Sequence, residues 1–151
     1  MTPAELQQYL HDHIPLSKAM QVVAVSVSPD AVVLRAPLAP NINHRETVFG
    51  GSASALAILA AWSLLHVRLR GSGSRLVIQR NSMEYLLPMA GEFTAGSALA
   101  RPDEWPRFLR MLERRGTARA TVVAELTCGG QTTGRLEGDF VALGPRAEQR
   151  G

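Results

Sequence analysis

The sequence predicts an α+β fold in which a curved antiparallel sheet of six strands wraps around one long buried helix. Two observations lead to this prediction. Residues 51–69 are apolar on every side of a helix, which is the pattern of a helix that is covered all round. Six segments with strand patterns flank this helix in the sequence. A sheet that curls around the helix buries the apolar surface of both.

The segments before the long helix predict a first helix and a β-hairpin. Residues 3–20 have helical spacing, and Thr2 and Glu5 stand where the two partners of a capping box belong. Pro15 is expected to break or kink this helix, because proline lacks the amide hydrogen. Residues 21–38 alternate apolar and polar side chains on either side of a Pro-Asp turn, which predicts a hairpin.

The segments after the long helix predict four strands and one short helix. The strands are expected over residues 75–87, 92–100, 117–127 and 132–143. A short basic helix is expected over residues 103–115. The glycine pair Gly129-Gly130 predicts a tight hairpin turn between the last two strands. We expect one domain over residues 1–145, followed by a disordered tail at residues 146–151.

The composition is that of a folded domain. A chain of 151 residues is long enough to bury roughly 68–70% of the surface that its unfolded form exposes. Hydrophobic residues make up 46% and charged residues 19%, which excludes a disordered chain. The net charge of +3 comes almost entirely from arginine, since Lys18 is the single lysine. Arginine favours bidentate contacts with phosphate and carboxylate groups.

Three features predict where the protein works. Cys128, the single cysteine, has no partner for an internal disulfide, which fits a reducing cytoplasm. The first residues lack the basic and apolar regions of a signal peptide. Residues 52–70 approach the length of a membrane span, but several serines, His66 and Arg68 interrupt them. We therefore expect a cytoplasmic protein that does not cross a membrane.

The most informative segment is NINHRETVFGGS, residues 41–52, which joins a polar loop to the long apolar helix. Gly50 and Gly51 stand at the start of that helix, where backbone N–H groups are unpaired and the helix dipole is positive. Such N–H groups stabilise negative charge that develops on a thioester oxygen, as in an oxyanion hole. The alternative is a glycine-rich turn that only lets the helix pack closely on the sheet.

This order of elements is the hot-dog fold, and the segment LAPNINHRETVFGGSASALAILAAW resembles the signature of a proteobacterial hot-dog thioesterase family. Members of that family occur alone or as the C-terminal half of a fusion to an acetyltransferase domain. A later segment, MEYLLPMAGEF, is similar to the exit of the third strand in many hot-dog proteins. The positions that match the family signature are Asn43, His44, Thr47, Phe49, Gly50, Gly51, Ser52 and Trp62.

The resemblance implies a substrate class and an assembly. The substrates would be acyl thioesters of coenzyme A or acyl carrier protein, so that coenzyme A or phosphopantetheine arrives as part of the substrate and no other cofactor is needed. Hot-dog proteins pair their sheets, which implies a homodimer or a dimer of dimers with sites at the subunit boundary. Some members of the family are associated with decarboxylation of malonyl-acyl carrier protein, which feeds the initiation of fatty-acid synthesis.

The resemblance, together with the residues that are absent here, favours decarboxylation over hydrolysis. Many hot-dog thioesterases carry a histidine before the two glycines and a carboxylate about two turns into the helix. Phe49 and the apolar residues 57–59 occupy those positions here. Hydrolysis needs an activated water or nucleophile, whereas loss of CO₂ from a malonyl thioester needs a desolvating pocket and a donor to the enolate. Thioester hydrolysis remains the first alternative, and a non-catalytic module that binds acyl carrier or coenzyme A remains the second.

Three polar side chains of the loop are candidate catalytic residues. Asn43 has an amide that can donate to an enolate oxygen or a carboxylate; alternatively it bonds its own loop, as Asn41 is expected to do. His44 could orient the substrate or transfer a proton, or it could point away from the pocket. Glu46 is the single carboxylate of the loop and a candidate general base, with a solvated side chain as the alternative.

The candidate substrate-binding residues are Phe49, Gly50, Gly51, Ser52 and Ser82. Ser52 is also expected to cap the helix, and Ser82 is expected to line the pocket from the sheet because it interrupts an apolar strand. No metal site is expected, since no cysteine or carboxylate completes the histidine pair near the N-terminus. Nucleic acid is not expected as a partner, because few aromatic residues interleave with the arginines. The basic stretch could dock an acidic carrier protein or coenzyme A phosphates, or be a solvated helix face; its residues are Arg101, Arg107, Arg110, Arg114, Arg115 and Arg119.

Overall fold

A computed structural model, which describes residues 1–145, contains one antiparallel sheet of six strands in the order β1-β2-β4-β5-β6-β3. Every neighbouring pair of strands is antiparallel. The strands are β1 (Val23–Val27), β2 (Val32–Ala36), β3 (Arg75–Tyr85), β4 (Phe93–Leu99), β5 (Thr117–Cys128) and β6 (Gln131–Leu143). The helices are α1 (Pro3–His13), α2 (Pro15–Ala19), α3 (Gly50–Arg68) and α4 (Trp105–Arg115), with short 3-10 turns at Ala39–Asn41 and Pro102–Glu104.

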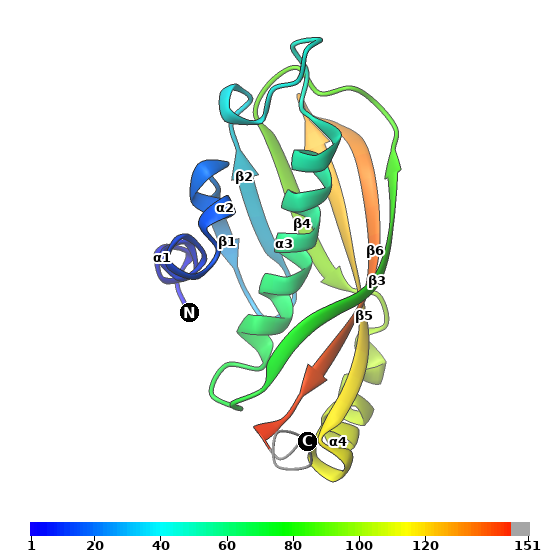
Figure 1. The fold of residues 1–151 in the computed structure, drawn as a ribbon. Coiled ribbons are helices and arrows are strands. Elements are labelled where there is room, and N and C mark those ends of the chain that lie inside the picture. Colours follow the sequence, from blue (N-terminus) through cyan, green and yellow to red (C-terminus); the bar gives the residue numbers. More distant parts are fainter. Residues whose placement is uncertain (146–151) are drawn as a thin grey trace.

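The sheet curls around α3, as the sequence predicts (Figure 1). Helices α1 and α2 lie beside β1, and α4 lies at the end of the molecule where α3 finishes. Phe108 of α4 belongs to the same small buried cluster as Leu69, the residue that follows α3. The start of α3 therefore lies at the opposite end of the molecule from α4.

Small residues let α3 approach the sheet closely. Ala57 and Ala60 are fully buried, and Ser97 of β4 donates its hydroxyl to the Ala60 carbonyl at 2.8 Å. Leu56 and Leu64 are also fully buried in the same core. Burying each leucine side chain contributes roughly 1.5–3 kcal/mol, so the contact between α3 and the sheet is a large part of the core.

The helix is not covered all round within one chain. Partly buried residues alternate with buried ones and form a stripe along α3, at Ala55, Ile58, Trp62 and His66. The prediction of a helix covered on every side is therefore wrong for the isolated chain. By length and composition α3 could cross a membrane, but half of its apolar window is buried inside the fold, as in the core helix of a globular domain.

Most of the predicted element boundaries lie within about two residues of the observed ones. Residues 3–20 do form two helices separated at Ile14, just before Pro15. The capping box is present, because the Glu5 amide donates to Thr2 Oγ1 at 3.1 Å and the Thr2 amide donates to the Glu5 carboxylate at 2.8 Å. The predicted tail at residues 146–151 lies outside the described residues.

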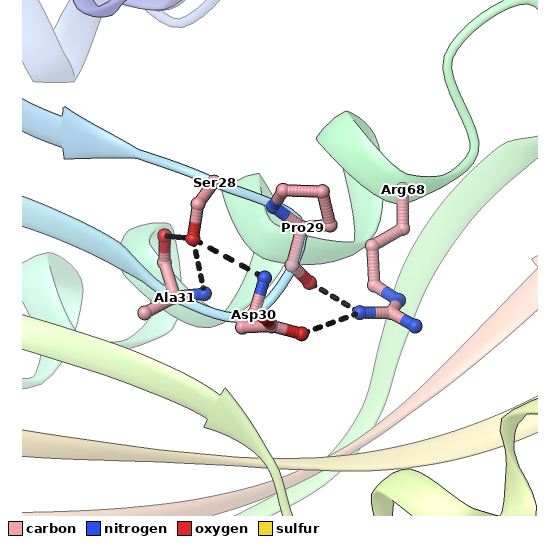
Figure 2. Close-up of polar contacts among 5 residues, drawn as sticks. All are labelled: Ser28, Pro29, Asp30, Ala31 and Arg68. Carbon is pink, nitrogen blue, oxygen red and sulfur yellow. Dashed lines mark hydrogen bonds and ion pairs between the residues drawn. The ribbon is translucent and has the colours of Figure 1, made fainter.

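Arg68 ties the end of α3 to the turn between β1 and β2. Its guanidinium Nη1 donates to the Pro29 carbonyl and lies 3.9 Å from the Asp30 carboxylate, in the turn between β1 and β2 (Figure 2). The Ser28 hydroxyl accepts the amides of Asp30 and Ala31 and so holds this turn in shape. Burial lowers the pKa of Arg68, and Asp30 opposes that shift.

Candidate functional site

The loop before α3 is held together by its own backbone. Ile42 and Val48 form an isolated antiparallel bridge, and the Phe49 amide donates to the Asn41 carbonyl at 2.7 Å. The buried Asn41 side chain donates to the carbonyls of Met20 and Pro37 at 3.0 and 2.8 Å. Asn41 therefore has the structural role expected from the sequence, and it anchors the loop to the rest of the fold.

The side chain of Asn43 also forms its hydrogen bonds within the loop. Its Nδ2 donates to Thr47 Oγ1 at 2.9 Å, and its Oδ1 accepts the amides of Arg45 and Thr47 at 2.8 and 3.2 Å. The sequence left two roles open for Asn43, and this geometry favours the loop-bonding one. Asn43 positions Thr47, and Thr47 lines the cavity described below.

His44 and Glu46, the other two candidate catalytic residues, are exposed at the tip of the loop. Glu46 has φ = 63°, the left-handed conformation, which lets the loop reverse direction. Its amide donates to the Asn43 carbonyl at 3.2 Å. Neither side chain lines the cavity at the start of α3, so this chain alone gives neither of them access to a substrate there.

Helix α3 begins at Gly50 without a side-chain cap. Phe49 occupies the N-cap position, and Ser52 lies inside the first turn, so the prediction that Ser52 caps the helix is wrong. The amides of Gly50, Gly51 and Ser52 form no hydrogen bond with any other part of residues 1–145. Three N–H groups with the positive end of the helix dipole behind them are thus open to a ligand.

The Phe49 ring lies directly over the first turn of α3. A Cβ atom added at Gly51 would lie 2.4 Å from Cε1 of Phe49, closer than any real contact. Glycine at this position is therefore what lets the ring fold back onto the helix. The ring remains 57% exposed, so it forms part of the molecular surface beside the open N–H groups.

A cavity of about 260 Å³ opens at the start of α3. Thr133 closes its base by donating its hydroxyl to the sulfur of Met89 at 2.9 Å, and both residues are buried. Tyr85 forms one side, with its hydroxyl 3.4 Å from the Gly50 carbonyl. The lining residues are Thr47, Val48, Gly50, Ala53, Tyr85, Leu86, Leu87, Pro88, Met89, Leu126 and Thr133.

The wall of this cavity is chemically sparse. Among the described residues that line it there is no carboxylate, imidazole, thiol or amine, and the polar groups are two threonine hydroxyls, one phenol and backbone amides. Elsewhere in residues 1–145, no three His, Cys, Asp or Glu side chains come together in a group that could hold a metal ion. The cavity offers hydrogen-bond donors and an apolar surface.

A β-bulge decides which residues of β3 face the cavity. The register of β3 on β6 shifts between Ile78 and Arg80, so Ile78 pairs with Phe140 and Arg80 with Asp139. Strict alternation from Ile78 would have turned Ser82 toward α3. The bulge reverses the alternation, and Ser82 lines a different cavity on the outer face of the sheet. Ser82, which was expected to line the substrate pocket, is therefore not part of the cavity at the start of α3.

The same bulge brings in a residue that sequence reasoning missed. Tyr85 faces the α3 cavity, whereas its neighbour Glu84 lines the cavity on the outer face. Without the bulge, the carboxylate of Glu84 would take the inward side. Tyr85 lies in the segment that resembles the exit of the third strand, and Thr47 lies in the family signature, but neither position indicated a cavity role by residue type alone.

Comparison with known proteins gives one family and a set of shared folds. The family model described as "Putative thioesterase (yiiD_Cterm)" matches residues 3–144. A protein of unknown function from Chlorobaculum tepidum TLS has a TM-score of 0.85 at 28% identity, with 95% of this chain and 97% of that chain covered.

Two further structures share the fold at lower identity. The putative thioesterase from Shewanella oneidensis has a TM-score of 0.80 at 24% identity, over 93% of this chain and 96% of that chain. A thioesterase from Haemophilus influenzae has a TM-score of 0.76 at 12% identity, over 95% of this chain and 92% of that chain. The fold is therefore that of known thioesterases, with the open N–H groups of α3 beside the cavity.

Proposed function

Because the chain belongs to the putative thioesterase (yiiD_Cterm) family and has the hot-dog fold, we propose that it decarboxylates the malonyl thioester of an acyl carrier protein. The family and its structural relatives support an enzyme that acts on acyl thioesters. The observation that carries the finer assignment is the cavity at the start of α3, which is lined by Gly50, the first residue with an unpaired amide, and by no carboxylate, imidazole, thiol or amine among the described residues. Phe49, Gly51 and Ser52 are next to Gly50 in the chain but are not among the lining residues of this cavity.

The proposed reaction breaks one carbon–carbon bond. The malonyl carboxylate sits against the apolar wall formed by Leu86, Leu87 and Ala53, where loss of hydration destabilises its charge. The bond from that carboxylate to C2 breaks, CO₂ leaves, and the electron pair moves onto the thioester as an enolate. The amides of residues 50–52 donate to the enolate oxygen. A proton from water then adds to C2 and gives the acetyl thioester, with the bond to the carrier intact.

Thioester hydrolysis is the second candidate, and the family description supports it. Hydrolysis needs a group that activates water. The nearest carboxylate in the sequence, Glu46, is exposed at the loop tip, and Glu84 lies on the outer face of the sheet. Hydrolysis therefore needs a base from a second copy of the chain, whereas the proposed decarboxylation needs no base.

We also propose that the enzyme works as a homodimer in the cytoplasm. In one chain the apolar stripe of α3 is partly exposed, and large apolar side chains of β3 are exposed. Monomeric proteins rarely expose large apolar patches of this kind. A second copy of the chain would cover both, and it would enclose the mouth of the cavity.

One assay tests the proposed reaction. The purified protein is incubated with malonyl-acyl carrier protein, malonyl-coenzyme A and a panel of acyl-coenzyme A thioesters, and free thiol and acetyl product are measured separately. We expect acetyl thioester without release of thiol. Thiol release without acetyl product would contradict decarboxylation and show that the protein is a hydrolase. If the protein binds these thioesters but reacts with none of them, the result would support the non-catalytic binding module in place of an enzyme.

A further inference from the structure

Strand β3 forms a free edge of the sheet. This strand is the last in the sheet order and pairs with β6 alone. Natural proteins usually blunt a free edge with charges or by covering it, yet large apolar side chains stay exposed along and just beyond this strand, at Val77, Ile78, Tyr85, Leu86 and Leu87. The proposed homodimer therefore pairs β3 of one copy antiparallel with β3 of the other.

Charge selects the register of that pairing. Placing Arg80 opposite itself would set like charges across the two-fold axis, which is destabilising. Placing Arg80 opposite the partner's Glu84 sets opposite charges on the same outer face of the sheet. Arg80 is already opposite Asp139 on β6, and Glu84 is opposite Arg135. The row across the dimer then alternates in sign, and Ser82 lies at the axis.

The same register matches the apolar side chains. With Ser82 at the axis, the segment of β3 that holds Val77 and Ile78, before the bulge, runs along the partner's Leu86 and Leu87, which follow its β3. All four side chains are between 38% and 49% exposed in the single chain. One register therefore covers the exposed apolar residues and pairs the charges, which is the consistency expected of a specific interface.

In this pairing, α4 of one copy lies near the substrate cavity of the other. Ser72 and Ser74, which lead directly into β3, line a cavity together with Leu109 and Leu112 of α4. In the antiparallel pair, the residues before β3 in one copy lie across from the residues after β3 in the other. Those later residues include Leu86–Met89, which form a wall of the substrate cavity.

Within one chain, α4 is far from the cavity. The two lie at opposite ends of α3 (Figure 1), which has 19 residues and is therefore about 28 Å long. A phosphopantetheine arm is shorter than this helix. A carrier protein bound to α4 could therefore reach the cavity of the partner but not the cavity of the same chain.

The exposed face of α4 is basic. Arg107, Arg110 and Arg114 follow one another at spacings of three and four residues, so they form one stripe on the helix. All three are exposed, and none forms an ion pair with another residue within 1–145. Glu113 is the one carboxylate within the helix. This stripe fits the acidic surface of an acyl carrier protein, since complementary charge speeds encounter and orients the partner.

We propose that Arg107, Arg110 and Arg114 of one protomer dock an acidic acyl carrier protein whose thioester enters the cavity of the other protomer. The inference rests on the proposed function, because it takes the carrier-bound malonyl group as the substrate. Each site then consists of the cavity of one chain and the basic stripe of the other. A free chain would hold the stripe and the cavity too far apart to serve one carrier.

Charge reversal tests the stripe. We expect R107E/R110E/R114E to raise the KM for malonyl-carrier about tenfold or more, while turnover of malonyl-pantetheine, which has no carrier, continues. The single variant R110E is compared with K18E, a matched reversal of an exposed residue on α2. Thermal unfolding and the dimer mass of each variant show whether it is folded. An unchanged KM for malonyl-carrier in a folded triple variant would overturn the docking surface.

Mixed dimers test whether docking acts across the interface. G50W fills one cavity, because a Cβ at Gly50 meets only Tyr85, at 3.7 Å. When G50W is on one chain and the reversed stripe on the other, the intact cavity faces an intact stripe. That dimer should keep about half of the wild-type activity on malonyl-carrier. When both changes are on the same chain, activity on malonyl-carrier should be lost.

The outcomes separate the two proposals. If the mixed dimer is active only when both changes are on the same chain, the carrier docks on the chain that processes its thioester. If the wild-type protein is a monomer, the proposed interface does not exist. Either result overturns the inference. If wild-type protein turns over malonyl-pantetheine but does not bind carrier protein in calorimetry, the inference fails and the proposed chemistry survives. If it turns over neither substrate, both fail.

Discussion

The guanidinium carbon of Arg68 lies 4.4 Å from the centroid of the Trp105 ring. Arg68 is the last residue of α3 and Trp105 the first of α4, so this one contact joins the core helix to the basic helix. The Arg68 side chain is only 16% exposed, although it carries a charge. Partial burial strengthens the attraction between a cation and an aromatic face.

We expect R68A and W105L each to lower the free energy of unfolding, with a coupling energy of about 0.5–2 kcal/mol between them. The coupling arises because each single change removes the same contact. A double-mutant cycle measured by denaturant unfolding checks this value. R68K is the control, because it keeps the charge and loses the planar guanidinium. Additive losses would mean that the two residues act independently.

Replacing Asn43 should act through the loop. N43A removes the acceptor of two amides and the donor to Thr47, so it should lower the free energy of unfolding by about 1–3 kcal/mol and reduce turnover. N43D keeps the acceptor and loses the donor. For a positioning residue, N43D should recover more stability than turnover. If N43A is as stable as wild type but loses about 10²–10³ in kcat, Asn43 instead meets the substrate directly.

Replacing Gly51 should reduce turnover, because any side chain at this position collides with the Phe49 ring. G51A places a methyl group within 2.4 Å of the ring, so the ring must swing away from the first turn of α3. Because the ring is exposed, stability should change by less than about 1 kcal/mol, while turnover falls. The double variant F49A/G51A should then be no worse than F49A alone. Fully additive losses of turnover in the double variant would contradict the contact.

The stability of the fold should fall in mild acid because of His66. Burial, and then the nearby charges of Arg70 and His13, lower the pKa of His66 below 6.5. The unfolded chain therefore binds a proton at a higher pH than the folded chain, which favours unfolding as the pH drops below about 6.5. His66 stacks on both Tyr9 and Trp62, with ring centroids 4.4 and 4.8 Å away.

H66F keeps the ring stack and removes the titration. Its free energy of unfolding, measured between pH 8 and pH 5, should depend less on pH than that of wild type. H44F, which removes an exposed histidine of the loop, is the matched control for the loss of an imidazole. An identical slope in H66F and wild type would assign the acid sensitivity to other groups.

The fold could be predicted because its signals are local. The capping box at Thr2 and Glu5, the proline at residue 15 and the glycine pair at residues 129–130 each act over a few neighbouring residues. Alternation along the strands and the apolar helix then determine what must be buried. These signals were enough to predict one sheet around one helix and to locate the loop before that helix.

The site was harder to predict because its signals are not local. No residue type in β3 announces the bulge between Ile78 and Arg80, yet the bulge turns Tyr85 toward the cavity and Ser82 away from it. The role of Asn43 depends on where its amide points, and both orientations suit the same sequence. Local sequence patterns do not predict which residues a second chain would place at the cavity, because those residues are not neighbours of the loop in the sequence.

The uncapped start of α3 has a consequence for engineering. Phe49 has φ = −57° and ψ = 134°, a conformation that serine adopts readily at an N-cap. F49S should therefore raise the free energy of unfolding by about 0.5–2 kcal/mol, because the hydroxyl accepts an amide of the first turn. In the proposed decarboxylation that amide donates to the enolate, so kcat should fall in the same variant; a gain in both would place the chemistry elsewhere. Selection for thermal stability alone would thus tend to inactivate this enzyme at its central helix.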